Sequence, residues 1–70
     1  MKYINHDITI DFPVPECLRY IMEQAEEADA IEDEGNYIAF ADQIDIIAKN
    51  CCADGAITEK QWALISCRYP

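Results

Sequence analysis

Residues 36–53 carry a continuous apolar stripe with helical spacing, and this stripe constrains the fold more than any other feature of the sequence. Successive residues of a helix are about 100° apart, so the members of the stripe fall on one face. Asn36 stands before it as a good cap residue, and Gly55 follows it at a position that commonly ends a helix. The sequence therefore predicts a helix over residues 36–53 that buries Tyr37, Phe40, Ala41, Ile44, Ile47, Ala48 and Cys51.

A second amphipathic pattern covers residues 15–31, where an apolar stripe lies opposite a face of charged residues. Pro15 suits the first turn of a helix, because the backbone N–H that proline lacks would have no partner there. Glu32 would fall within the stripe if the helix continued, so the helix should stop near Ile31 and leave residues 32–34 as an acidic turn. The residues expected to be buried are Cys17, Leu18, Ile21, Met22, Ala25 and Ala28.

Residues 58–69 begin with the strongest helix-start signal in the chain. Thr58 and Gln61 have the spacing of a capping box, in which each side chain bonds to the backbone N–H of the other residue. Ile57 and Trp62 occupy the two positions of a hydrophobic staple. We therefore predict a third helix over residues 58–69.

The N-terminal residues 1–13 follow a different pattern. Every second residue from Ile8 to Phe12 is apolar, which is typical of a half-buried strand. The turn-forming residues 5–7 would allow residues 3–4 to fold back on this strand as a small hairpin. Two strands alone are marginally stable in water, so the hairpin would have to pack on the helices.

These elements amount to a mostly α fold, a compact three-helix single domain over residues 1–70 with a short N-terminal extended arm or β-hairpin. A chain of 70 residues that is 51% hydrophobic can build a core, but the entropy lost on ordering the chain offsets most of the gain from burial. A homodimer would ease this shortage of buried area. The predicted helices leave Ile38, Ile46 and Leu64 outside their buried faces, and these residues are the expected apolar interface of such a dimer.

The net charge of -9 is confined to the middle of the chain. No basic residue lies between Arg19 and Lys49, and that interval holds nine acidic residues, whereas the other five acids are balanced by five bases. Like charges one helical turn apart cost free energy, so an all-acidic face is unusual for a merely solvated helix. The face either binds a basic partner surface or only keeps the chain soluble, and repulsion by phosphates argues against direct binding to nucleic acid. The partner-binding residues would be Glu23, Glu26, Glu27, Asp29, Glu32, Asp33 and Glu34.

Histidine and serine, two residue types that are common in catalytic centres, occur only once each. His6 is the single histidine and Ser66 the single serine, so no set of nucleophile, base and orienting group comes together. We therefore expect a protein that is not an enzyme and needs no cofactor. No segment has the roughly 20 apolar residues of a membrane span, and no signal peptide follows Met1, which predicts a cytoplasmic protein.

The four cysteines lack the spacing of a zinc site, because Cys51 and Cys52 are adjacent while Cys17 and Cys67 are isolated. Outside a secretory context they are expected to be reduced thiols, with Cys17 and Cys51 in the core. The sequence predicts no metal site. The alternative that three of the cysteines converge on a metal, with or without His6, stays open.

Residues 50–61 are similar to the second half of an EF-hand calcium loop through Asp54 and Gly55. Cys52 stands where that loop has an acid, and Gln61 replaces the glutamate that completes the coordination shell. Calcium binding is therefore not expected, and the segment is interpreted as a connection between two helices.

The acidic middle of the chain and its ending, from Ile57 to Trp62 and from Arg68 to Pro70, resemble small acidic proteins of Gram-positive phages and mobile elements. This resemblance implies an accessory or counter-defence role, including that of a DNA-mimic inhibitor, and it transfers no role to any single residue. Two hypotheses follow. The chain is a protein-interaction module that engages a basic surface or a nucleic-acid-binding protein, or it is a small homodimeric structural or accessory subunit.

Overall fold

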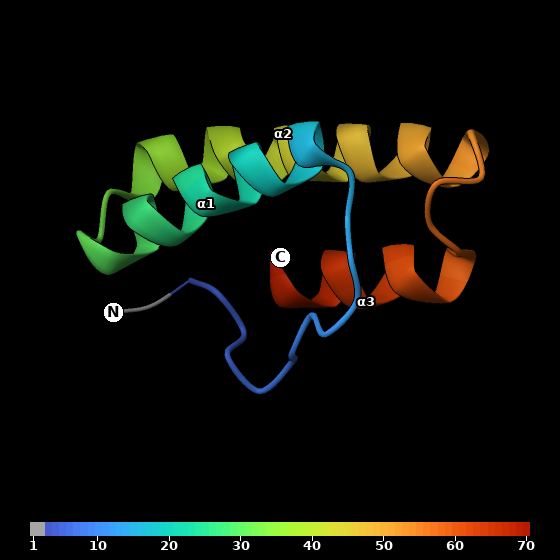
Figure 1. The fold of residues 1–70 in the computed structure, drawn as a ribbon. Helices are drawn as coiled ribbons and strands as arrows, with labels where there is room; N and C mark the ends of the chain where they lie inside the picture. The colour runs from blue at the N-terminus through green and yellow to red at the C-terminus, as the bar shows by residue number, and fades with distance from the viewer. Residues whose placement is uncertain (1–2) are drawn as a thin grey trace.

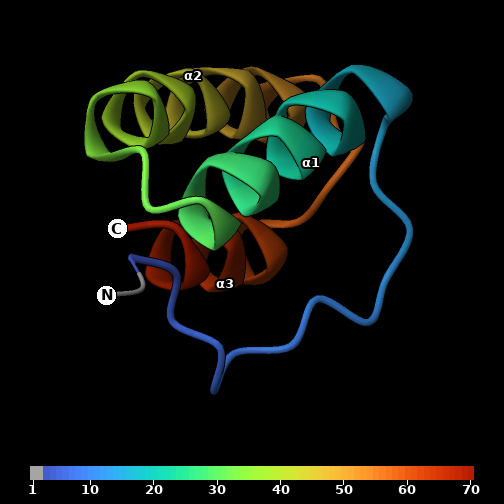
Figure 2. The same cartoon turned by 90° about the vertical axis from the view of Figure 1, so that its left-hand side faces the viewer.

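The computed structural model describes residues 3–70, and three helices dominate this part of the chain (Figure 1). α1 spans Glu16–Ala30, α2 spans Glu34–Ala53 and α3 spans Glu59–Arg68. α1 and α2 lie side by side and run in opposite directions, and α3 turns back along them (Figures 1 and 2). The prediction of a mostly α fold is confirmed. None of these helices is long and apolar enough to cross a membrane.

One large side chain from each helix forms the centre of the core. Leu18 of α1, Ile44 of α2 and Ile65 of α3 are almost completely enclosed. The stripes predicted for α1 and α2 face this centre and are buried or half-buried, with the exception of Cys17. The prediction that Cys17 lies in the core is wrong. It stands in the first turn of α1 at the edge of the stripe and is exposed, although its thiol lies next to that of the buried Cys51.

The junction between α1 and α2 differs from its prediction. α1 ends at Ala30 with Ile31 as its C-cap, which agrees with the predicted end near Ile31, and Glu32 takes a left-handed backbone conformation with φ of 57°. The N-cap of α2 is Asp33 rather than Asn36: its carboxylate accepts the backbone N–H of Asn36 at 3.3 Å and the Asn36 side-chain N–H at 2.7 Å. The helix therefore begins at Glu34, which was expected to lie in the acidic turn.

The start of α3 agrees with its prediction. The Oγ1 atom of Thr58 accepts the backbone N–H of Gln61 at 3.1 Å, and Oε1 of Gln61 accepts the backbone N–H of Thr58 at 2.9 Å. Gly55 has φ of 81°, the left-handed conformation that reverses the chain after α2. Together these residues direct α3 back along α2.

Residues 3–15 contain no strand and no hairpin, so the prediction of paired strands there is wrong. They form an arm that passes across α3 before it reaches the start of α1 (Figure 1). The backbone N–H of Asn5 donates to the carbonyl oxygen of Arg68 at 2.9 Å, and the Arg68 guanidinium donates to the carbonyl oxygen of Ile8. The end of α3 thus supplies partners that a second strand would otherwise provide.

The alternating sequence of residues 8–12 reflects burial on one side rather than strand pairing. The apolar residues from Ile8 to Phe12 are half-buried, and the polar residues between them are exposed. Ile4, nearer the N-terminus, is buried in the core with the helices. A single segment lying on a helical surface therefore produces the pattern that is usual for a strand at the surface of a sheet.

Candidate functional site

The seven acidic residues predicted to bind a partner do not form one surface, because two of them hold the fold together. Asp29, in the last turn of α1, is only 2% exposed. Its Oδ1 atom accepts the backbone N–H groups of Tyr3 and Ile4, the latter at 3.1 Å, and its Oδ2 atom lies 3.3 Å from Nε2 of His6. Asp29 therefore fastens the arm to α1 and is not available to a partner.

Glu26 is the second acid that the fold uses. Its Oε2 atom accepts a hydrogen bond from the hydroxyl of Tyr69 at 2.6 Å and from the guanidinium of Arg68 at 3.0 Å. The Nε–H of Arg68 also donates to the Tyr69 hydroxyl at 3.3 Å. We call these three residues the Glu26 cluster. It joins the middle of α1 to the end of α3.

The Glu26 cluster favours one protonation state for its members. Burial raises the pKa of Tyr69 to about 12, and its hydrogen bond to Glu26 acts in the same direction. Burial by itself would lower the pKa of Arg68, but hydrogen bonds to Tyr69 and Glu26 outweigh it and raise that pKa. At neutral pH the cluster therefore holds a neutral phenol and a charged guanidinium.

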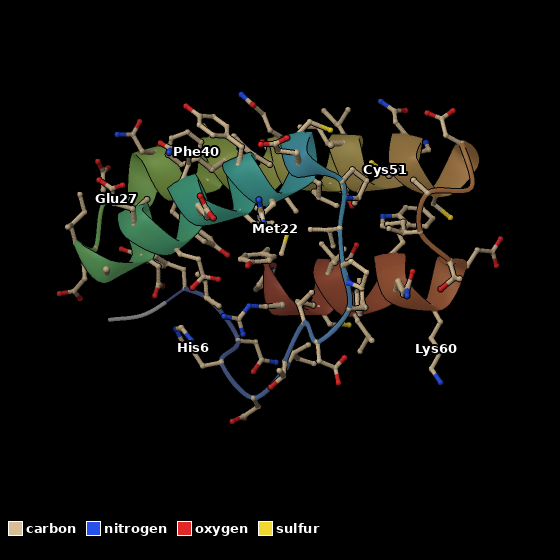
Figure 3. All side chains as sticks on the ribbon, viewed as in Figure 1. His6, Met22, Glu27, Phe40, Cys51 and Lys60 are labelled. Carbon is tan, nitrogen blue, oxygen red and sulfur yellow. The ribbon has the colours of Figure 1, made fainter. Side chains whose placement is uncertain are left out.

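Three of the predicted acids remain available. Glu23 and Glu27 lie one turn apart on α1 and Glu34 begins α2; all three are exposed, and none forms an ion pair with residues 3–70. Figure 3 shows Glu27 on the outside of α1. Asp33 is half-exposed and caps α2, while Glu32 is exposed and its carbonyl oxygen accepts from the Tyr3 hydroxyl at 3.4 Å. We call Glu23 and Glu27 of α1 and Glu34 of α2 the exposed acidic face, a name that groups them by exposure and by charge.

The residues of the predicted apolar interface differ in their exposure to solvent. On α2, Ile38 is 54% exposed and Ile46 is 59% exposed, whereas Leu64 on α3 is half-buried. The structure adds two exposed apolar side chains of α1 and its C-terminus, Tyr20 and Ile31. Leu64 thus contributes less to an apolar surface than the two isoleucines.

The cysteines are free thiols that do not meet at one point. Cys17 and Cys67 are exposed, Cys52 is half-buried and Cys51 is buried. Burial raises the pKa of the Cys51 thiol, and the neighbouring thiol of Cys17 raises it further. Among residues 3–70 no three His, Cys, Asp or Glu side chains are grouped so that they could hold a metal ion.

A hollow of about 580 Å³ lies between the arm, α1 and the end of α3, and no pattern in the sequence predicts it. Its wall includes Arg19 and Glu23 of α1, together with apolar side chains of the arm. No periodic signal marks such a hollow, because it depends on how far the arm stands away from the helices. Comparison of the chain with protein-family models, with curated proteins and with solved structures gives no match.

Proposed function

We propose that this chain is a non-catalytic protein-interaction module that binds a basic partner surface through the exposed acidic face. One observation carries the proposal. The fold uses Glu26 and Asp29 in internal contacts, whereas Glu23, Glu27 and Glu34 remain exposed without a cation within residues 3–70. These three acids have no role in holding the described structure together that would account for their position.

Repulsion between the charges of the exposed acidic face raises the free energy of the isolated chain, and a basic partner would remove this repulsion. Glu23 and Glu27 are four residues apart on α1, and like charges at this spacing cost about 0.2 to 0.5 kcal/mol. A lysine or arginine placed between them removes this repulsion and adds an attraction. Charge complementarity of this kind raises the association rate and selects against acidic partners.

The chemistry of the partner is that of a basic protein surface. Residues 23–34 hold seven acids, but Glu26 and Asp29 are engaged inside the molecule, so fewer charges face outward than the sequence contains. Imitation of duplex DNA, with its two closely spaced phosphate rows, is therefore supported less well than binding to a basic patch. A nucleic-acid-binding protein is the partner class in which such patches are commonest.

The test compares two triple variants of equal net charge. One carries Glu23→Gln, Glu27→Gln and Glu34→Gln; the other carries Asp7→Asn, Asp11→Asn and Glu59→Gln, three exposed acids outside the face. A partner captured by the wild type from extracts of the native host would be purified, and its affinity for each protein measured at low and at high salt.

We expect the first variant to lose at least about tenfold in affinity at low salt and to show a weaker salt dependence, because the lost charges are those that pair. The second variant should bind like the wild type. Equal losses in the two variants would mean that net charge alone attracts the partner. That result would contradict the proposed site.

A second candidate function rests on the exposure of Ile38 and Ile46. These two residues lie eight positions apart on α2 and project from a helix whose other face is buried. A homodimer that packs the two copies of this face together would cover them. Sedimentation of the wild type and of a variant with Ile38→Ser and Ile46→Ser distinguishes the two functions, since only the dimer predicts a concentration-dependent mass that the variant loses.

A further inference from the structure

The hollow beneath the arm is held open by the way the arm is attached. Figure 2 shows the arm leaving α3, swinging outward and returning to the start of α1. It is fixed to the end of α3 by the bonds of Asn5 and Ile8 to Arg68. Between these points, residues 9–14 make no hydrogen bond within the described part of the chain. The hollow is open to solvent, and its volume of about 580 Å³ is within the size range of small-molecule sites.

One side of the hollow is apolar. Ile10, Phe12 and Val14 line it from the arm, and all three are half-buried. Met22 lines it from α1, and Figure 3 shows this side chain reaching from α1 toward α3. The three arm residues offer an apolar surface that is partly wet in the structure and would be covered by a hydrocarbon group of a ligand, whereas Met22 is already buried and forms the apolar floor beside them.

The polar side of the hollow carries two opposite charges that do not neutralise each other. Arg19 and Glu23 both line it, one helical turn apart on α1, and they form no ion pair. A basic residue four positions before an acidic one is the weaker orientation for pairing within a helix, which agrees with their separation. Both residues are exposed and line the hollow, so neither charge is neutralised by the other.

The hollow as a whole is electrically balanced, in contrast to a chain with a net charge of -9. Glu26 and Arg68, which also line it, pair with each other at 3.0 Å, and the imidazole of His6 in the same wall lies 3.3 Å from Oδ2 of Asp29. The groups left for a ligand are thus one cation, Arg19, and one anion, Glu23. A ligand that satisfies both needs one carboxylate-like group and one ammonium-like group, and it carries no net charge.

We propose that the hollow binds an apolar α-amino acid in its zwitterionic form. Its carboxylate pairs with the guanidinium of Arg19, its ammonium pairs with the carboxylate of Glu23, and its side chain covers Met22 and Phe12. An arginine pairs well with a carboxylate because two parallel N–H donors match the two oxygens. An amino acid places both charges within one short unit and leaves its side chain free, which matches the arrangement of the wall.

The test is a titration of the full chain with L-leucine and L-phenylalanine, followed by the amide resonances of Phe12, Arg19 and Met22 in NMR spectra. An open site of this kind should bind in the millimolar range. Leucinamide lacks the carboxylate and N-acetyl-leucine lacks the ammonium group, so each should bind at least about tenfold more weakly than leucine. Binding of all three compounds with equal affinity, or no shift of these resonances with leucine, would overturn the proposal.

Two single variants test which residue pairs with each charged group of the ligand. Arg19→Gln should weaken leucine binding about tenfold and remove the preference for leucine over leucinamide, whereas Glu23→Gln should remove the preference over N-acetyl-leucine. Glu16→Gln changes an exposed acid of α1 outside the hollow and should bind leucine like the wild type. If both single variants bind leucine as the wild type does, Arg19 and Glu23 do not contact the charged groups of the ligand, and the proposed binding mode is wrong. Glu23 belongs both to the hollow and to the exposed acidic face, whereas Glu27 and Glu34 do not line the hollow. A variant with Glu27→Gln and Glu34→Gln should therefore bind leucine like the wild type, which separates this site from the proposed partner surface.

Discussion

The hydroxyl of Tyr69 donates a 2.6 Å hydrogen bond to Oε2 of Glu26, across 43 positions of sequence. The bond ties the residue that follows α3 to the middle of α1. It also explains why Glu26 differs from Glu27, its neighbour in the sequence. The first holds the fold together, and the second is exposed on the outside of α1.

Substitution of Glu26 should therefore cost more stability than the same change at Glu27. Glu26→Gln weakens the bonds to Arg68 and Tyr69, and we expect a loss of about 1 to 2 kcal/mol in the free energy of unfolding. Glu27→Gln removes a like charge near Glu23 and should be neutral or slightly stabilising. Urea unfolding followed by circular dichroism measures both. Equal losses would show that Glu26 is not committed to the cluster.

Removal of the hydroxyl should change the stability of the fold in different ways at the two buried tyrosines, Tyr69 and Tyr37. Tyr69→Phe leaves Glu26 without its shortest hydrogen bond and should destabilise by about 1 to 3 kcal/mol. The hydroxyl of Tyr37 is buried and has no hydrogen-bond partner within residues 3–70, so Tyr37→Phe should be neutral or stabilising. Thermal unfolding of the two variants provides the comparison, and a larger loss at Tyr37 would contradict it.

The same two tyrosines predict the behaviour at high pH. Burial raises the pKa of both from 10.0 to about 12, so between these values the folded chain retains protons that the unfolded chain has lost. Their contribution to stability is present in full below pH 10.0 and disappears as the pH rises through about 12. The urea midpoint should fall across this range, less steeply when both residues are changed to Phe. A slope identical in wild type and double variant would argue against this origin.

Asp29 should control the docking of the arm. Asp29→Ala leaves the backbone N–H groups of Tyr3 and Ile4 without their acceptor, with an expected cost of about 2 to 4 kcal/mol. Asp29→Asn keeps one side-chain oxygen and should cost less. Hydrogen exchange of the Ile4 amide should accelerate strongly in the first variant and moderately in the second. Unchanged protection in both would mean that other contacts hold the arm.

The N-cap of α2 is Asp33 in the structure, whereas the sequence predicts Asn36. Asp33→Ala removes the side chain that accepts the backbone N–H of Asn36 and should cost about 1 kcal/mol. Asn36→Ala removes only an exposed side-chain bond and should cost a few tenths of that amount. Chemical unfolding of both variants decides between them; a larger effect at Asn36 would restore it as the cap.

The helices could be predicted because their signals are local. The stripe from Tyr37 to Cys51 and the capping box of Thr58 and Gln61 depend on residues within a few turns of each other, and the structure contains both. The strand at residues 8–12 was predicted wrongly because alternation reports burial on one side and not the identity of the partner. The end of α3, which supplies that partner, is far away in the sequence.

The division of the acidic residues was harder to predict, although one signal was present. Asp29 is seven positions after Met22, two helical turns along the same face, so a carboxylate at this place stands within the buried stripe. A buried carboxylate requires hydrogen-bond donors, and the backbone N–H groups of the arm provide them. Glu26 has no such signal, because its position on α1 is that of a solvated residue and its partners, Arg68 and Tyr69, follow from the tertiary fold alone.

The bonds between the arm and Arg68 also set an order of events during synthesis. Ile8 and Arg68 are 60 positions apart, so the arm leaves the ribosome well before the residue that binds it has been made. During that interval the apolar side chains of the arm, Ile10 and Phe12 among them, have no helix end against which to settle. A nascent chain halted before residue 68 would leave them open to chaperones, and the arm can dock on the end of α3 only after Arg68 has itself left the ribosome.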